Sequence, residues 1–433
     1  MTLSLTVAIT TIILIILSTI IKPSFKIKNV TVYFYYIFAF LGALVLLATS
    51  NVTFKEFING LTGSSGMNPL KILILFISMT MISIFLDELG FFNFVASYVL
   101  KITKNHQLPI FFSFYFLIAI LTMFTSNDII IFTLTPFIIF FSKRAKIDPI
   151  PYLVSEFTCA NTWSMMFVIG NPTNIYLSQS YNIGFLEYFL KMAIPTVLSG
   201  LTELLILYLI FKNKLKDEIN HDNEIIKVND KPLTIIGIII LLICTIFLVI
   251  SSYINIEMYL ISFISLITLL LISIIYLIIR NKKPTILLKT IKRAPYELIP
   301  FVISMFTIVL SLNKYGVTEN IANILKDTNG ILKYGISSFI SSNLLNNIPM
   351  SIGFGKIIEN AGEIVKYKAI YSTIIGSNLG AFLTPLGALA GIMWMNILKE
   401  HDIKFSFMSF IKYGIIISIP VLIVSLLSLS LFI

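Results

Sequence analysis

Long apolar runs recur from one end of the chain to the other, and polar clusters interrupt only some of them. A run of about 20 apolar residues is the length that an α-helix needs to cross the hydrocarbon core of a bilayer. The pattern predicts ten crossings, at about 3–21, 30–49, 68–88, 150–175, 192–211, 232–252, 256–279, 297–312, 369–398 and 407–431. The predicted fold class is therefore an all-α polytopic membrane protein.

Two further apolar segments, 109–141 and 334–358, carry polar residues in their middle. We interpret each as a re-entrant hairpin that enters and leaves the membrane by the same face. The tip of the first hairpin contains Ser126, Asn127 and Asp128. The tip of the second contains four polar residues: Ser342, Asn343, Asn346 and Asn347.

The basic residues give the orientation. Most of the 31 Lys and Arg residues fall in loops that this scheme places on one face, and the face richer in them is expected to be cytoplasmic. We therefore expect a protein of the cell membrane whose two chain ends lie on the side opposite the cytoplasm. A twelve-span scheme, with each hairpin as two full spans, fits the same charges.

Composition agrees with a membrane protein, since 57% of residues are hydrophobic and 12% are charged. The net charge of +10 is explained by these orienting loops and does not call for nucleic acid. Cys159 and Cys244 lie in apolar stretches without metal-ligand spacing. There is no Walker motif. The sequence predicts neither an enzyme nor a metal or other cofactor.

The two halves of the chain resemble each other. ISMTMISIFLDELG (77–90) and ISMFTIVLSLNKYG (303–316) are identical at six of 14 positions, and in each half a hairpin and a broken span follow. The predicted units are a first repeat, 1–211, a cytoplasmic linker, 212–231, and a second repeat, 232–433. Five crossings in each half give the repeats opposite orientations, which is typical of secondary transporters.

The broken spans contain GNPTN (170–174) and GSNLGAFLTPLG (376–387). Unwound backbone is tolerated at membrane depth where it lines a cavity, although a proline kink or close helix packing is the simpler alternative. We predict that these breaks and the hairpin tips together form a polar substrate site. The residues that the breaks contribute are Asn171, Thr173, Asn174, Ser377, Asn378 and Thr384.

Asp128 is the only carboxylate within the hairpin cores, and Glu156 lies inside the first broken span. An ionisable group at membrane depth is costly, so it is expected to face a cavity or carry a proton or cation. We predict that Asp128 and Glu156 couple transport to H⁺ or Na⁺. An alternative for Asp128 is a cap of the second hairpin limb. Arg and His occur only in predicted loops, which favours a small neutral or weakly charged solute.

Several stretches resemble the arsenical pump membrane protein (ArsB) family of the ion transporter superfamily. They are LDELGFF (86–92), SNDIIIFTLTP (126–136), NIGFLEYFLKMAIP (182–195), NNIPM (346–350) and YSTIIGSNLGAFLTPLGALAGIMWMNIL (371–398). The resemblance implies inverted repeats, two re-entrant hairpins and two interrupted helices. It also implies export of arsenite and antimonite, driven by the proton gradient alone or with a separate ATPase subunit.

The chain departs from this family at the breaks. The family pattern has Asp where Asn161 and Asn378 stand, and Pro-Lys where Ala381 and Phe382 stand. GNPTN replaces Ser-Asn-Leu-Val-Asn and is shared with anion permeases of the superfamily.

The first functional hypothesis is arsenite–proton exchange, in which Cys159 is either a soft ligand for the metalloid or a core residue. The second is a Na⁺- or H⁺-coupled transporter of carboxylates or small inorganic anions. The paired breaks argue against a third, a non-transporting scaffold or receptor.

Overall fold

The computed structural model describes residues 1–21, 24–27, 30–62, 68–103, 106–219, 225–325 and 330–433. The elements of the first half are α1 (Thr2–Ile21), β1 (Ser24–Ile27), β2 (Val30–Tyr33), α2 (Phe34–Ala48), α3 (Phe54–Thr62), α4 (Pro69–Glu88), α5 (Phe91–Ile102), α6 (Gln107–Phe124), α7 (Asn127–Ala145), α8 (Ile150–Trp163), two 3₁₀ turns, η1 (Ser164–Met166) and η2 (Val168–Gly170), α9 (Pro172–Ser180) and α10 (Phe185–Phe211). The second half contains α11 (Lys231–Ile250), α12 (Met258–Ile279), α13 (Thr285–Arg293), α14 (Leu298–Lys314), α15 (Val317–Leu325), α16 (Gly330–Leu345), α17 (Asn347–Glu359), α18 (Glu363–Gly380), α19 (Leu389–Glu400) and α20 (Phe407–Ser430).

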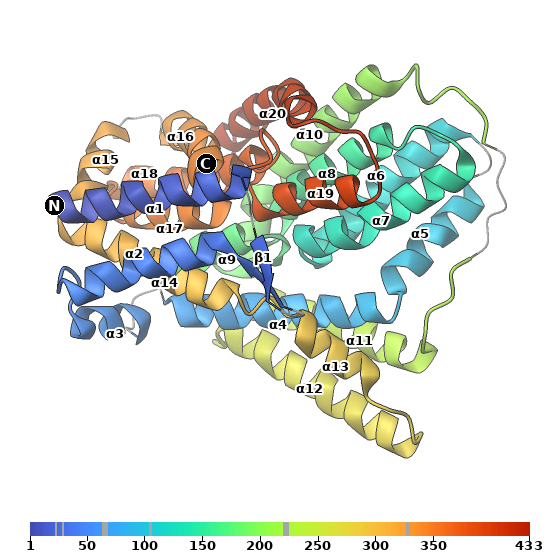
Figure 1. The fold of residues 1–433 in the computed structure, drawn as a ribbon, viewed down its shortest axis with the longest axis horizontal. Coiled ribbons are helices and arrows are strands. Elements are labelled where there is room, and N and C mark those ends of the chain that lie inside the picture. Colours follow the sequence, from blue (N-terminus) through green and yellow to red (C-terminus); the bar gives the residue numbers. More distant parts are fainter. Residues whose placement is uncertain (22–23, 28–29, 63–67, 104–105, 220–224, 326–329) are drawn as a thin grey trace.

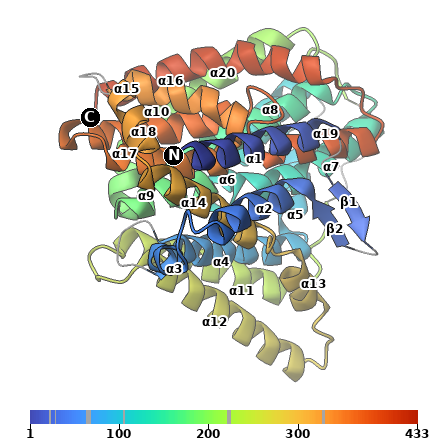
Figure 2. The ribbon, with the colours of Figure 1, turned by 60° about the vertical axis from the view of Figure 1, so that its left-hand side comes forward.

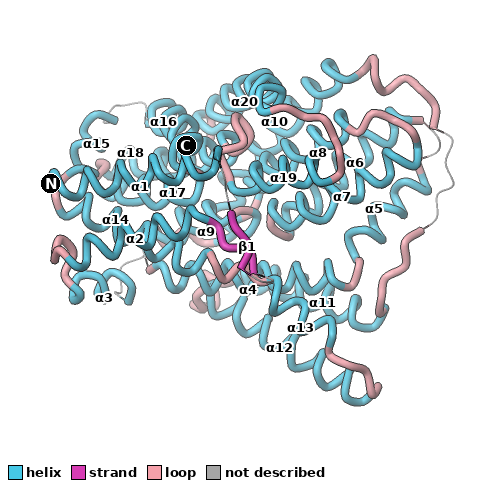
Figure 3. Tube along the Cα trace, viewed as in Figure 1, coloured by secondary structure: helices cyan, strands magenta, loops and turns pink. Residues whose placement is uncertain are grey.

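The fold is nearly all helical, as predicted (Figure 3). Among the described residues, seven helical segments are long and apolar enough to cross a membrane: Pro69–Glu88, Gln107–Phe124, Phe185–Phe211, Lys231–Ile250, Met258–Ile279, Thr285–Lys314 and Phe407–Ser430. Six of them contain or overlap predicted crossings, and the seventh is the first limb of the first hairpin. Exposed leucine and isoleucine side chains on α12 recur along one face, as expected for contact with lipid tails.

The two broken spans are interrupted at the positions where glycine and proline residues predicted a break in the helix. The first consists of α8, the turns η1 and η2, and α9. The second consists of α18, an irregular stretch at 381–388, and α19. Gly387 has no room for a Cβ, which would lie 2.3 Å from the carbonyl oxygen of Gly380. Close approach of backbone to backbone therefore requires glycine at this break.

The hairpins also occur at the predicted segments, as α6–α7 and α16–α17. Their tips lie near the middle of the molecule. The α6–α7 hairpin extends to the right of the view and α16–α17 to the left (Figure 1). The limbs of the second hairpin, with 16 and 13 residues, are shorter than the roughly 20 residues of a full span.

Both halves contain the same order of helices, α4 to α10 and α14 to α20, with a hairpin and a broken span at corresponding places. Gly90 follows α4 and Gly316 follows α14, and both have positive φ, at 78° and 73°. Left-handed backbone favours glycine because it lacks a Cβ. The sequence match at 77–90 and 303–316 therefore marks the same helix–turn–helix in each half.

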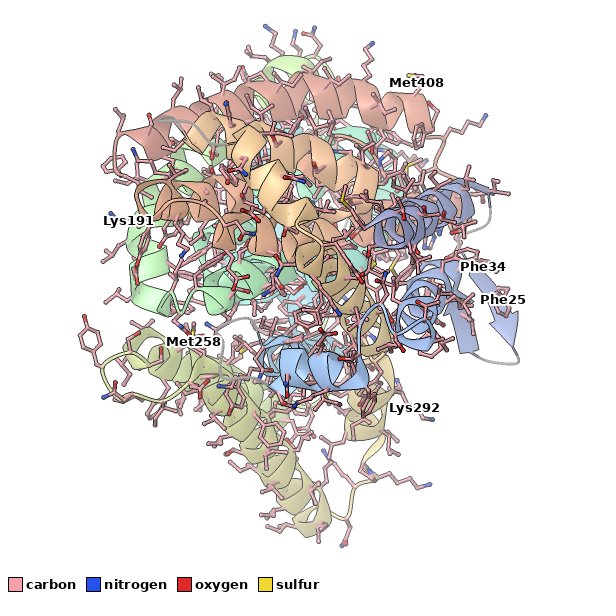
Figure 4. The ribbon with its side chains drawn as sticks, turned by 90° about the vertical axis from the view of Figure 1, so that its left-hand side faces the viewer. Phe25, Phe34, Lys191, Met258, Lys292 and Met408 are labelled. Carbon is pink, nitrogen blue, oxygen red and sulfur yellow. The ribbon has the colours of Figure 1, made fainter. Side chains whose placement is uncertain are left out.

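Some elements differ from the prediction. Residues 30–33, predicted as the start of a crossing, form β2, which pairs antiparallel with β1 (Figure 2). Phe25 of β1 lies beside Phe34 of α2, with ring centroids 5.1 Å apart (Figure 4). Four short helices, α3, α5, α13 and α15, were also not predicted.

The predicted linker, 212–231, contains residues 220–224, which lie outside the described part of the chain. Its second end is fixed to the turn after α4. The backbone N–H of Asn229 donates to Leu89 O at 2.9 Å, and its side chain donates to Glu88 O at 3.0 Å. Asp230 then caps α11. This end of the linker is thus bound to the helices of the first half.

Candidate functional site

A network of side-chain amides joins the two broken spans. Asn378 of α18 donates to Asn174 Oδ1 at 2.7 Å and to Ile374 O at 2.8 Å. Its own Oδ1 accepts from the Ser164 hydroxyl and from Asn171 Nδ2, both at 2.9 Å. Both donors and the carbonyl oxygen of this buried amide are therefore satisfied.

The tip of the first hairpin reaches the same network. Asn127, the first residue of α7, donates to Asn161 Oδ1 at 3.0 Å, and Asn161 donates to Phe157 O at 2.8 Å. The Ser164 hydroxyl lies 2.7 Å from Asn161 O as well, so its single proton is shared between Asn161 O and Asn378 Oδ1. Asn161 and Asn378, where the family pattern has acids, are fully buried and hydrogen-bonded as neutral amides.

The first break itself is organised by two asparagines. Asn171 caps α9, since its Oδ1 accepts from the backbone N–H and the hydroxyl of Thr173, each at 3.1 Å. Asn174 donates to Ser164 O at 2.8 Å. The predicted residues Asn127, Asn171, Thr173, Asn174 and Asn378 are thus brought together.

The predicted residues of the second hairpin form a separate group. Asn343 Oδ1 accepts from the backbone N–H and the hydroxyl of Thr384, at 3.1 and 2.8 Å. The Asn347 N–H donates to Gly387 O at 3.0 Å, and Asn346 caps α17. The Ser342 hydroxyl donates within its own helix. The second hairpin tip is thereby attached to the second break.

Asp128 does not join the amide network. It lies in the first turn of α7, where a negative charge suits the helix N-terminus, while Ser126 holds the N-cap position. The capping alternative is therefore not observed. Ser126 and Asp128 instead line a cavity of about 330 Å³ between α4, α7, α14 and α19.

Two other buried acids form hydrogen bonds at α8, Glu156 on this helix and Glu203 on α10. The Glu156 carboxylate accepts from the Thr135 hydroxyl of α7 at 2.9 Å. Glu203 of α10 accepts from the hydroxyls of Thr158 and Thr162. Within the described residues neither acid forms an ion pair. These carboxylates connect α8 to α7 and α10, and their bonds to described side chains are made to threonines outside the amide network.

The remaining predicted residues have simpler settings. Ser377 is fully buried next to Asn378, and its hydroxyl has no partner within the described structure. Cys159 is fully buried and donates from Sγ to Tyr115 O at 3.3 Å, which is the core role and not that of a solute ligand.

Sequence reasoning missed Ser164 and Thr80. Ser164 lies three residues after Asn161 on the same broken span, so helical spacing from that asparagine was an available signal. Thr80 lines the cavity from α4, a helix whose many buried apolar residues gave no such signal.

The network is electrically neutral. The side chains that bond to one another there belong to asparagine, serine and threonine, and no Lys or Arg of the described chain takes part. Such a constellation can bind a small polar solute through amide and hydroxyl groups. Three helix N-termini, those of α7, α9 and α17, adjoin the tips and breaks and offer positive dipole ends.

Comparisons with known proteins agree with this architecture. The family model described as citrate transporter matches residues 34–370. The arsenical pump membrane protein of Escherichia coli K12 is 26% identical over 376 residues, covering 82% of this chain and 85% of that protein. An uncharacterised transporter of Synechocystis is 23% identical over 422 residues, covering 91% of each chain.

The fold is also found in a solved structure. The YdaH transporter of Alcanivorax borkumensis superposes with a TM-score of 0.60 at 10% identity, covering 99% of this chain and 98% of that one. The match at 34–370 spans well over half of this sequence. The chain therefore belongs to the citrate transporter family and is a multi-pass secondary transporter related to the arsenical pump membrane proteins.

Proposed function

We propose that this protein exports arsenite and antimonite, as trivalent hydroxides, in exchange for protons. The observation that carries the proposal is the neutral network that joins the first hairpin tip and the two breaks. A neutral hydroxide presents O–H donors and oxygen acceptors, which amides and hydroxyls match. A multiply charged carboxylate would need cationic partners, and the network contains none among the described residues.

The proposed movement follows from the bonds between the breaks. Because Asn378 bonds to both Asn171 and Asn174, the two broken spans, α8–α9 and α18–α19, are expected to move as one block with the hairpins. The other helices would form the scaffold, giving alternating access. We further propose inverted repeats at 1–211 and 232–433, placement in the cell membrane, and both termini outside the cytoplasm.

Asp128 is the proposed proton-coupling residue, with Glu156 as a second one. Asp128 lines a cavity and has no ion-pair partner among the described residues. A carboxyl group in that position can bind and release a proton as the cavity opens to one side or the other. The remaining named amides and hydroxyls, including Ser342, Asn343, Asn346, Asn347, Ser377 and Thr384, would surround the solute path.

Transport by the purified protein in liposomes tests the proposal. Vesicles with an acidic lumen should accumulate arsenite as protons leave, while empty liposomes and citrate give no signal. Addition of a separate ATPase subunit is not required in this assay. Absence of arsenite uptake together with Na⁺-dependent citrate uptake would contradict the proposal.

That opposite result defines the second candidate, a Na⁺- or H⁺-coupled transporter of carboxylates or small inorganic anions. The observation in its favour is the presence of helix N-termini at the amide network, at Asn127 and Pro172, and at the second hairpin tip, at Asn347. Their partial positive charges can substitute for basic side chains in binding an anion. The same vesicles, assayed with citrate, succinate and phosphate, distinguish this candidate from the first.

A further inference from the structure

The cavity beside Asp128 has two walls that belong to different parts of the fold. Ser126 and Asp128 come from the first hairpin, which the proposed mechanism places in the moving block. Thr80 of α4 and Glu297, at the start of α14, come from the proposed scaffold. The cavity thus lies at the boundary across which movement is expected.

Two hydroxyls in this cavity have no hydrogen-bond partner among the described residues. Thr80 and Ser126 are each only 4% exposed, and both line the cavity. Leaving a buried hydroxyl unsatisfied costs about 1–3 kcal/mol, so such groups are expected to contact a ligand or water. They offer oxygen atoms, which hard cations prefer.

The charges in the cavity are unbalanced. Arg293 lies at the wall, but its guanidinium pairs with Asp87 at 2.8 Å and with Glu88 at 2.6 Å. Lys289 approaches Glu88 at 3.7 Å, so these four groups neutralise one another.

Asp128 and Glu297 are then the two acids of the lining that have no basic partner among the described residues. Two uncompensated carboxylates in a cavity with apolar walls attract cations and repel anions.

We propose that this cavity is the entry chamber for a monovalent cation, H₃O⁺ or Na⁺, on its way to Asp128. Glu297 binds the cation first, at the side of the basic α13. The hydroxyls of Thr80 and Ser126 then supply oxygen ligands next to Asp128. This inference rests on the proposed coupling role of Asp128, and it adds a scaffold carboxylate to the cation path.

The test measures the reaction of an introduced thiol with charged reagents and needs no transport. The native cysteines are buried and serve as the unreactive background. A Thr80→Cys variant is treated with a cationic and an anionic methanethiosulfonate of similar size, in membranes exposed on one face at a time. Ser126→Cys is the second reporter, and Ser83→Cys, buried on the same helix as Thr80, is the matched control.

With each rate divided by the rate of the same reagent with a free thiol in solution, the cationic reagent should react about fivefold or more faster than the anionic one, and only from the face that carries α13. Glu297→Gln should reduce this preference severalfold. Glu257→Gln, which removes an acid paired with Lys71 on the surface, should leave it unchanged. Equal rates for both reagents, no reaction at either reporter, or access from the opposite face would overturn the inference.

The identity of the cation follows from the ratio of the cationic to the anionic labelling rate, because this ratio does not depend on the fraction of thiol that is ionised. A lower ratio in sodium than in choline at equal ionic strength assigns Na⁺, whereas a ratio that falls only on acidification assigns the proton. A Glu297→Gln variant that keeps the full preference overturns the role of Glu297. A protein that passes these tests but moves no arsenite would contradict the proposed substrate and leave the cation chamber intact.

Discussion

The side-chain amide of Asn378 donates to Asn174 Oδ1 at 2.7 Å and so joins α18 of the second half to α9 of the first. The bond is fully buried. Buried polar groups specify structure strongly when all of them are satisfied. This one bond therefore helps to fix the relative position of the two broken spans.

The Asn378→Asp change restores the acid of the family pattern and removes both amide donors. Asn174 Oδ1 and Ile374 O then lose their partners and face a carboxylate. We expect a loss of about 2–4 kcal/mol in unfolding free energy at neutral pH. Thermal unfolding in detergent measures it, with Asn396→Asp on the exposed face of α19 as the control. Unchanged stability would mean that the network rearranges or that the new acid is held neutral.

Replacing Gly90 or Gly316 by alanine should destabilise the protein to a similar extent. Each glycine has positive φ, and an added Cβ would have no described atom within 4 Å apart from its chain neighbours, so only backbone strain is added. The expected cost is about 1 kcal/mol at each position. Gly353, inside α17, also has open space but no positive φ, so Gly353→Ala should be neutral or stabilising by up to about 1 kcal/mol. Unequal losses at Gly90 and Gly316 would count against the repeat.

Asp230 gives the stability a defined pH dependence. Burial raises the pKa of Asp230, but Lys282, the Leu233 N–H and Tyr276 outweigh burial and hold this pKa below its ordinary value of 3.8. The contribution is therefore complete above the ordinary value and is lost as the pH falls through the lowered pKa.

In an Asp230→Asn variant this acid-dependent loss should disappear, although asparagine still caps α11. Unfolding temperatures between about pH 7 and pH 3 measure the difference. Asp217→Asn, in the exposed linker, is the matched control. An acid transition identical to that of the unmodified protein would show that another group is responsible.

Much of the architecture follows from the sequence because hydrophobic length and helix breakers act locally. Apolar runs locate the spans, and Gly170, Pro172, Gly387 and the hairpin polar residues locate the interruptions. The short helices could not be found in this way. TILLKTIKR, the sequence of α13, alternates apolar and basic residues over only nine positions and does not resemble a span.

The hydrophobic pattern also could not predict the direction in which individual side chains point. Asn127 and Asp128 are adjacent, and adjacent residues on a helix point to different faces. One therefore reaches the amide network while the other lines the cavity. Which face of a helix contacts which neighbouring helix depends on packing between segments that are distant in the sequence. The local pattern of residues does not determine these contacts.

Proton movement driven by arsenite reports directly on exchange through Asp128. Protein in liposomes that contain a pH-sensitive dye is given an inward arsenite gradient, and luminal pH is recorded. We expect the lumen to become more alkaline with the unmodified protein and with Asp148→Asn, a control in an exposed ion pair. With Asp128→Asn we expect no pH change. Alkalinisation by Asp128→Asn at the unmodified rate, or arsenite entry without proton movement, would contradict the proposed exchange.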